Sequence, residues 1–102
     1  MIEKTPIPTL EMLRERREDL LQVAARRGVK NVRVFGSVAR GEAEANSDID
    51  LLVDLPPHFS LLDFSGLVRE MQEVVGYRVE IASAAHLREE MREGILQEAE
   101  PL

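Results

Sequence analysis

Cysteine and tryptophan are absent from the 102-residue sequence, and its aromatic residues are limited to three phenylalanines and one tyrosine. Without cysteine, the chain forms neither disulfides nor thiolate metal sites. So few aromatic side chains do not make a platform on which nucleic-acid bases could stack. No apolar run approaches the roughly 20 residues of a membrane-spanning helix, and the first ten residues lack the regions of a signal peptide. We therefore expect a cytoplasmic protein that does not enter a membrane.

Positive charge is also scarce, with 13 Lys and Arg against 19 Asp and Glu and a net charge of -6. The basic residues are interleaved with acidic ones, as in RERRED (14–19) and LREEMREG (87–94). Such mixed runs are typical of solvated helix faces, whereas binding to nucleic acid requires clustered Lys and Arg. A nucleic-acid polymer is therefore not expected as a partner.

Length and patterning predict a single domain, residues 1–102. The expected elements are a helix (9–27) capped by Thr9, a strand (31–35), a short helix after Gly36-Ser37, a strand (48–55), a helix (60–76), a strand (77–81), and a helical region after Ser83 in which Gly94 can introduce a break. This α-β-α-β-α-β-α order predicts an α+β fold of two layers, in which helices cover a small mixed sheet of about three strands.

The helix over 60–76 has the clearest local signals. Ser60 and Asp63 occupy the positions of a capping box, and Gly76 is suited to end the helix. Its predicted buried face consists of Leu61, Leu62, Phe64, Leu67, Val68, Met71, Val74 and Val75. The helical positions of Met12 and Met91 also predict core residues.

Gly36 and Ser37 follow the first predicted strand. Glycine lets the backbone approach a ligand closely, and N–H groups at the start of the next helix, with the Ser37 hydroxyl, suit a phosphate. The alternative is that Gly36 only makes a tight turn and Ser37 only caps a helix, because Gly-Ser pairs are common in turns.

Asp48 and Asp50 are two residues apart in a strand, so both side chains emerge on one face. Adjacent carboxylates repel each other unless a cation lies between them, and Mg²⁺ binds carboxylates together with substrate phosphates. The alternative is a solvated acidic face. Asp54 favours this alternative, because its side chain would lie on the same face of the strand as Asp48 and Asp50. Asp54 itself is interpreted as a surface residue at the strand end.

Glu80 lies in the last predicted strand, on the face opposite Val79 and Ile81. If that strand neighbours the strand of Asp50, the three carboxylates could hold two metal ions roughly 3.5–4 Å apart. Glu80 could also accept the proton of an attacking hydroxyl. An exposed glutamate paired with a lysine or arginine is an equal alternative.

The segment GSVARGEAEANSDIDLLV (36–53) resembles the nucleotidyltransferase superfamily signature, Gly-Ser-x-Ala-Arg-Gly followed after a short spacer by Ser-Asp-x-Asp-Leu. That superfamily includes DNA polymerase beta and kanamycin nucleotidyltransferase. The chain looks like the minimal nucleotidyltransferases (MNT proteins) over nearly its whole length. In bacteria and archaea many of these are encoded beside a HEPN-domain protein and serve as the antitoxin of a toxin–antitoxin pair.

The resemblance implies a role for each motif residue. Gly36 and Ser37 match the family's phosphate-binding turn, and Asp48 and Asp50 match its metal-binding pair. Glu80 stands where the family usually has an aspartate, so its carboxylate reaches further than the family's does.

Two further motif residues belong to the predicted nucleotide site. Arg40 matches the motif arginine, which contacts phosphate or pairs with an acid; we favour the structural role. Ser47 is expected to cap the approach to the second strand, with a secondary place near the nucleotide. His58 and His86 lie outside the motifs and are interpreted as surface residues.

The resemblance therefore implies a Mg²⁺-dependent nucleotidyltransferase with a two-metal site, which transfers AMP from ATP to a hydroxyl of a HEPN toxin and so acts as its antitoxin. One alternative is an antitoxin that acts by binding alone, with a weak or vestigial catalytic site. Another is transfer to a small molecule such as an aminoglycoside. The sequence leaves open the preferred nucleotide, the acceptor hydroxyl, and whether the protein forms a homo- or a hetero-oligomer.

Overall fold

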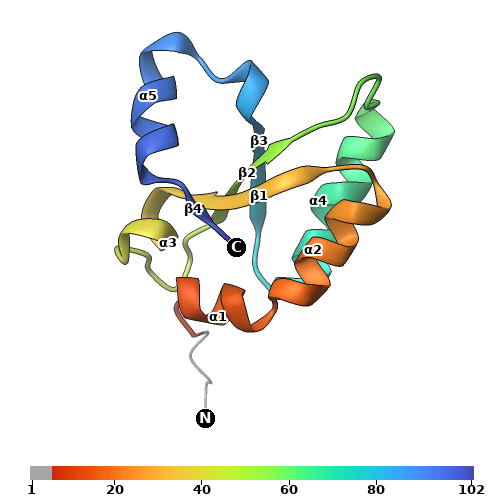
Figure 1. Ribbon diagram of the computed structural model, residues 1–102. Helices are drawn as coiled ribbons and strands as arrows, with labels where there is room; N and C mark the ends of the chain where they lie inside the picture. Colours follow the sequence, from red (N-terminus) through yellow and green to blue (C-terminus); the bar gives the residue numbers. More distant parts are fainter. Residues whose placement is uncertain (1–5) are drawn as a thin grey trace.

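A computed structural model describes residues 6–102 of the chain (Figure 1). Residues 1–5 belong to the predicted single domain and to the stretch predicted to lack a signal peptide, and they lie outside the described residues. The elements in chain order are α1 (Leu10–Glu15), α2 (Arg17–Arg26), β1 (Lys30–Phe35), α3 (Gly36–Arg40), β2 (Ile49–Asp54), α4 (Leu61–Val75), β3 (Val79–Ser83), the 3₁₀ helix η1 (Ala84–His86), α5 (Glu89–Glu98) and β4 (Glu100–Pro101). No helix within residues 6–102 is long and apolar enough to cross a membrane.

The strands form one mixed sheet in the order β3-β2-β1-β4. β1 runs antiparallel to β2 and to β4, while β2 and β3 are parallel. The predicted α+β class with a mixed sheet is confirmed. β4 adds a fourth strand beyond the predicted three, because two residues leave no alternating pattern in the sequence.

The predicted helix over 9–27 is wrong in one respect, since it is divided at Arg16 into α1 and α2. Thr9 caps α1 as expected, accepting a hydrogen bond from the Met12 N–H (3.1 Å). The N–H of Arg16 donates to both the Met12 and Leu13 carbonyls, which is the tightening found at helix ends. The Arg16 side chain donates to the Val74 carbonyl of α4 (3.3 Å) and so anchors the junction.

One face of the sheet is covered by α2 and α4, which lie side by side (Figure 1). Alternate residues of β2 point into the core beneath them, while those between point to the other face. The core is formed by Leu13, Leu20, Val23, Ala24, Val29, Val32, Val34, Val38, Ile49, Leu51, Val53, Leu67, Met71, Val75 and Val79. The face with Asp50 also carries the fully buried Leu52, so it is polar only toward the start of β2.

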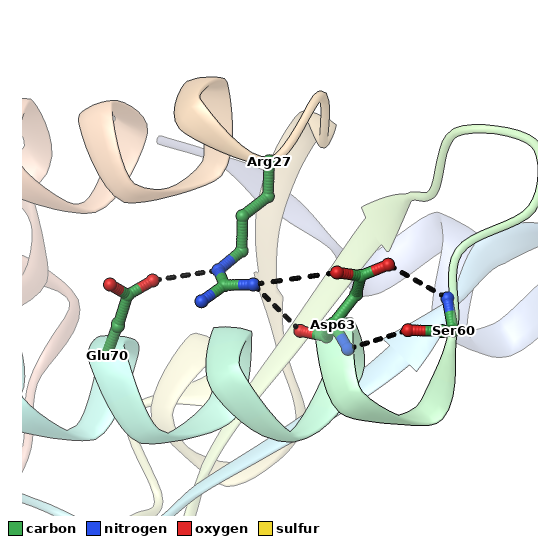
Figure 2. Close-up of polar contacts among 4 residues, drawn as sticks. All are labelled: Arg27, Ser60, Asp63 and Glu70. Carbon is green, nitrogen blue, oxygen red and sulfur yellow. Dashed lines mark hydrogen bonds and ion pairs between the residues drawn. The ribbon is translucent and has the colours of Figure 1, made fainter.

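Arg27, directly after α2, fastens α4 to that helix (Figure 2). Its Nε donates to Glu70 Oε1 (2.8 Å) and its Nη1 to the Asp63 carbonyl (3.4 Å). Asp63 also completes the predicted capping box with Ser60, which is confirmed. Gly66 makes room for the guanidinium, because a Cβ there would lie 2.5 Å from Arg27 Nη2.

Three predicted core residues are exposed instead. Leu61 and Leu62 are 88% and 85% exposed, because they lie in the first turn of α4 and the buried residues of that helix begin only at Gly66. Met91 is 51% exposed on α5, a helix without any buried residue. α5 is also continuous through Gly94, at which the sequence allows a break.

Candidate functional site

The parallel pairing of β2 and β3 brings Asp50 and Glu80 together. Asp50 is the register partner of Glu80, between the core-facing pairs Ile49–Val79 and Leu51–Ile81. Paired residues of neighbouring strands project on the same face, so the two carboxyl groups lie side by side. The strand neighbourhood on which the predicted role of Glu80 depended is present.

Gly36 brings the candidate phosphate turn against the same carboxyl group. It follows β1, whose last residue, Phe35, pairs with Asp50. Its φ is 75°, and a Cβ there would lie 2.2 Å from Asp50 Oδ2. Glycine is therefore required both by the left-handed backbone and by the close approach to the carboxylate. The turn and the carboxyl pair form one continuous surface.

Negative charge is concentrated at Asp50. The pKa of its carboxyl group is raised to about 6, mainly by burial and then by a hydrogen bond with Glu80 and by the charges of Glu80, Asp48 and Glu98. The charged form of such a group is disfavoured until a proton or a cation compensates it.

Asp48 directly precedes β2 and forms an ion pair with a neighbouring arginine. Its Oδ1 lies 3.6 Å from Nε of Arg78, an exposed side chain. Glu80 is exposed, and within residues 6–102 it forms no ion pair with a lysine or arginine, unlike the alternative considered for it. The structure thus brings together Asp50 and Glu80, while Asp48 is paired with Arg78 and acts on Asp50 through its charge.

The fit of these residues to a metal ion is partial. No group of three or more His, Cys, Asp or Glu side chains within residues 6–102 is arranged to hold a metal ion. The carboxyl pair of Asp50 and Glu80 nevertheless has the hard oxygen donors that Mg²⁺ prefers and an excess of negative charge. Asp48 would join it on leaving Arg78, whose side chain is 85% exposed.

Arg40 and Ser47 hold the loop between β1 and β2. Arg40 donates through Nε to Glu42 Oε1 (2.8 Å) and through Nη1 to Glu98 Oε1 (2.9 Å), and these two bonds raise the pKa of its guanidinium. Ser47 Oγ accepts from the Glu44 N–H (2.8 Å) and closes a turn ahead of β2. Both contacts are of the structural kind favoured for these residues.

Glu98 is a site residue that sequence reasoning missed. Its Oε2 accepts a hydrogen bond from the Gly36 N–H (2.7 Å), and its charge contributes to the raised pKa of Asp50. Glu98 lies 62 residues beyond Gly36 in the chain and outside the motif. No local pattern distinguishes it from the other glutamates of the mixed-charge C-terminal segment.

A cleft of about 570 Å³ opens beside the carboxyl pair. Asp50 and Glu80 stand among largely apolar lining residues that include Phe35, Phe64, Val68 and Ile81. Its size is within the range of small-molecule sites. A polar ligand group at the carboxylates and an apolar or ring-shaped group next to it would both be accommodated.

Comparison with known proteins identifies the family. Residues 10–101 match the family model described as a nucleotidyltransferase domain. The chain belongs to this family. Among curated relatives, protein adenylyltransferase MntA of Thermococcus cleftensis is 36% identical over 76% of this chain and 78% of its own length. MJ0435 of Methanocaldococcus jannaschii, provisionally named a protein adenylyltransferase, is 34% identical over 85% of this chain and 94% of its own.

Solved structures confirm the nucleotidyltransferase fold. A structure described provisionally as a minimal nucleotidyltransferase is 49% identical, with a TM-score of 0.81 over 92% of this chain and 96% of that one. A toxin–antitoxin structure with AMP-PNP has a TM-score of 0.70 over 82% of this chain and 69% of that one, at 14% identity, and so supports the fold alone. The prediction of a nucleotidyltransferase enzyme is confirmed at the level of the family.

Proposed function

We propose that the protein is a protein adenylyltransferase that transfers AMP from ATP to a hydroxyl group of a toxin partner. The observation that carries the proposal is the contact of the Gly36-Ser37 turn with Asp50, which itself faces Glu80. In a nucleotidyltransferase domain, this contact puts a turn suited to phosphate next to carboxyl groups suited to a metal ion and a proton.

The transfer is a displacement at the α-phosphorus of ATP. The acceptor oxygen forms a bond to this phosphorus, the bond to the bridging oxygen breaks, and pyrophosphate leaves. The proton of the acceptor hydroxyl passes to the Glu80 carboxylate, which lies beside Asp50 and is exposed to an incoming acceptor. Positioning and charge stabilisation, rather than covalent chemistry by the protein, dominate catalysis of such transfers.

The carboxylates of Asp48, Asp50 and Glu80 are the proposed ligands of Mg²⁺, which would neutralise the charge that develops on the transferred group. Ser37 and the turn around it contact the triphosphate. Arg40 and Ser47 stay mainly structural, as their bonds to Glu42 and Glu44 support.

The acceptor is proposed to belong to a HEPN toxin, for which the protein is the antitoxin. Support for a protein acceptor comes from the relative named protein adenylyltransferase MntA. The single predicted domain, residues 1–102, then supplies the nucleotide site, and the partner presents the hydroxyl.

Intact-mass spectrometry of both chains after incubation with ATP and Mg²⁺ tests the proposal directly. The product of the adjacent gene serves as the candidate partner. It should gain the mass of AMP, and Asp50→Ala should abolish the gain. Asp54→Asn is the matched control, because Asp54 shares the strand and the face of Asp50 but binds Arg33 instead (3.1 Å). This control should preserve the modification.

The rival is an antitoxin that acts by binding alone. The observation that favours it is the carboxylate of Glu98, which occupies the Gly36 N–H at the candidate phosphate turn. Under this alternative, neither chain changes mass, and the Asp50→Ala variant still forms a stable complex that silences the partner. That result would replace the transferase proposal.

A further inference from the structure

Glu98, the last residue of α5, binds the candidate phosphate turn with one carboxylate oxygen and Arg40 with the other. Oε2 accepts from the backbone N–H of Gly36 (2.7 Å), and Oε1 accepts from Arg40 Nη1 (2.9 Å). The side chain is 26% exposed. One internal carboxylate therefore occupies two donors at the start and the end of α3.

The sheet topology fixes this position. β4 pairs Pro101 with Arg33 and Glu100 with Val34, and continuing the same antiparallel register places residue 98 opposite residue 36. The N–H of Leu102 donates to the Val32 carbonyl (3.1 Å) and fastens the end of the chain to β1. As Figure 1 shows, α5 descends into β4 next to α3. The carboxylate is thus held beside the turn by the fold rather than by chance.

Apart from the pairing of β4 that follows it, α5 is held loosely. None of its residues is buried, and its other anchor, a bond from Arg92 Nη1 to the Ala84 carbonyl (2.8 Å), lies toward its beginning. Rotation of the Glu98 side chain would therefore free the turn without unpacking the core.

Carboxylate and phosphate oxygens compete for the same donors, because backbone N–H groups and guanidinium groups bind either anion by charge-assisted hydrogen bonds. We propose that Glu98 is an internal competitor of the nucleotide, which lowers the affinity for ATP by occupying the Gly36 amide until phosphate displaces it. This inference rests on the proposed function, in which the triphosphate lies at the Gly36-Ser37 turn. Glu98 also adds negative charge beside Asp50, which opposes the entry of a polyanion.

The test is the dissociation constant of ATP in the presence of Mg²⁺, measured by calorimetry on the full chain. Glu98→Ala removes the competitor and should bind ATP about tenfold more tightly, since hydrogen bonds to charged groups are of that order. Glu98→Gln keeps the shape of the side chain without its charge and should bind with intermediate affinity. Glu93→Ala, an exposed residue of the same helix, is the control and should leave the affinity unchanged.

Unchanged or weaker binding of ATP by a folded Glu98→Ala variant would overturn the inference. Should that variant unfold, Glu98→Gln decides alone, and equal affinity to the original protein overturns it. Failure of the proposed function gives a different result. In that case neither the original protein nor any variant binds ATP, and the inference about Glu98 fails as well. If the original protein binds ATP and transfers AMP, but neither Glu98 variant binds ATP more tightly, only the inference about Glu98 is overturned.

Discussion

At the residue scale, the distinctive feature is a carboxyl group that the fold holds in an unfavourable setting. Asp50 is partly buried between the Gly36 turn and Glu80, so its ionised form loses hydration and meets other carboxylates. Carboxyl groups with a pKa shifted in this way are found at functional sites more often than elsewhere. They also make stability depend on pH in a direction that can be worked out.

The stability of the metal-free protein should fall as pH rises through the range between the two pKa values of Asp50. Its folded pKa, about 6, lies above the ordinary value of 3.8, so between them the folded state keeps a proton that the unfolded state releases. The free energy of unfolding therefore decreases with rising pH. After allowance for solvent screening, we expect a loss of about 1–2 kcal/mol.

Asp50→Asn should lose this pH dependence. Urea unfolding of both proteins in EDTA, from about pH 4 to about pH 7, measures it. The variant should gain stability relative to the original protein as pH rises. A difference between the two that stays constant across this range would contradict the electrostatic account.

At the scale of elements, the packing of α2 against α4 depends on an absent side chain. Gly66 leaves space for the Arg27 guanidinium, which lies across α4 to reach Glu70 (Figure 2). The ion pair lowers the pKa of Glu70. A glycine inside a helix is costly in itself, so its presence here is explained by this contact.

Gly66→Ala should destabilise the protein by about 1–2 kcal/mol, because the loss of the Arg27 contact outweighs the gain in helix propensity. Gly94→Ala is the matched control, since a Cβ at Gly94 meets nothing within 4 Å. That change should stabilise the protein by up to about 1 kcal/mol. Chemical denaturation measures both, and shifts of the same sign would refute the proposed role of Gly66.

The elements that the sequence predicts well are those whose signals are local. The capping box of Ser60 and Asp63, the end of α4 at Gly76 and the alternation around Asp50 each depend on a few consecutive residues, and the structure has all three. Contacts set by distant pairing leave no such signal. The exposure of Leu61 depends on where α4 meets its neighbours, which the helical period does not encode.

The site residues also divide into those that local sequence patterns predict and those that depend on distant contacts. Gly36, Asp50 and Glu80 were accessible to prediction, because strand parity places the carboxylates on one face and the motif links them to the turn. Glu98 was not, because its place depends on the register of a two-residue strand at the far end of the chain. The engagement of Asp48 with Arg78 is equally a matter of side-chain geometry that spacing does not determine.

At the scale of the whole molecule, the net charge of -6 and the acidic site both favour association with cations. Any added salt screens repulsion between the acids, whereas a bound divalent cation stabilises only the folded state in which its ligands converge. The two effects are separable at equal ionic strength. The proposed metal ligands can therefore be tested without any catalytic assay.

Mg²⁺ at a few millimolar should raise the melting temperature of the EDTA-treated protein by about 5 °C relative to NaCl of equal ionic strength, as expected for a gain of about 1 kcal/mol in a domain of this size. Asp50→Asn should abolish the rise, because it removes the carboxylate that faces both Glu80 and the Gly36 turn. Asp54→Asn should preserve it. Differential scanning fluorimetry measures all three proteins, and an equal rise in the Asp50→Asn variant would place the cation elsewhere on the acidic surface.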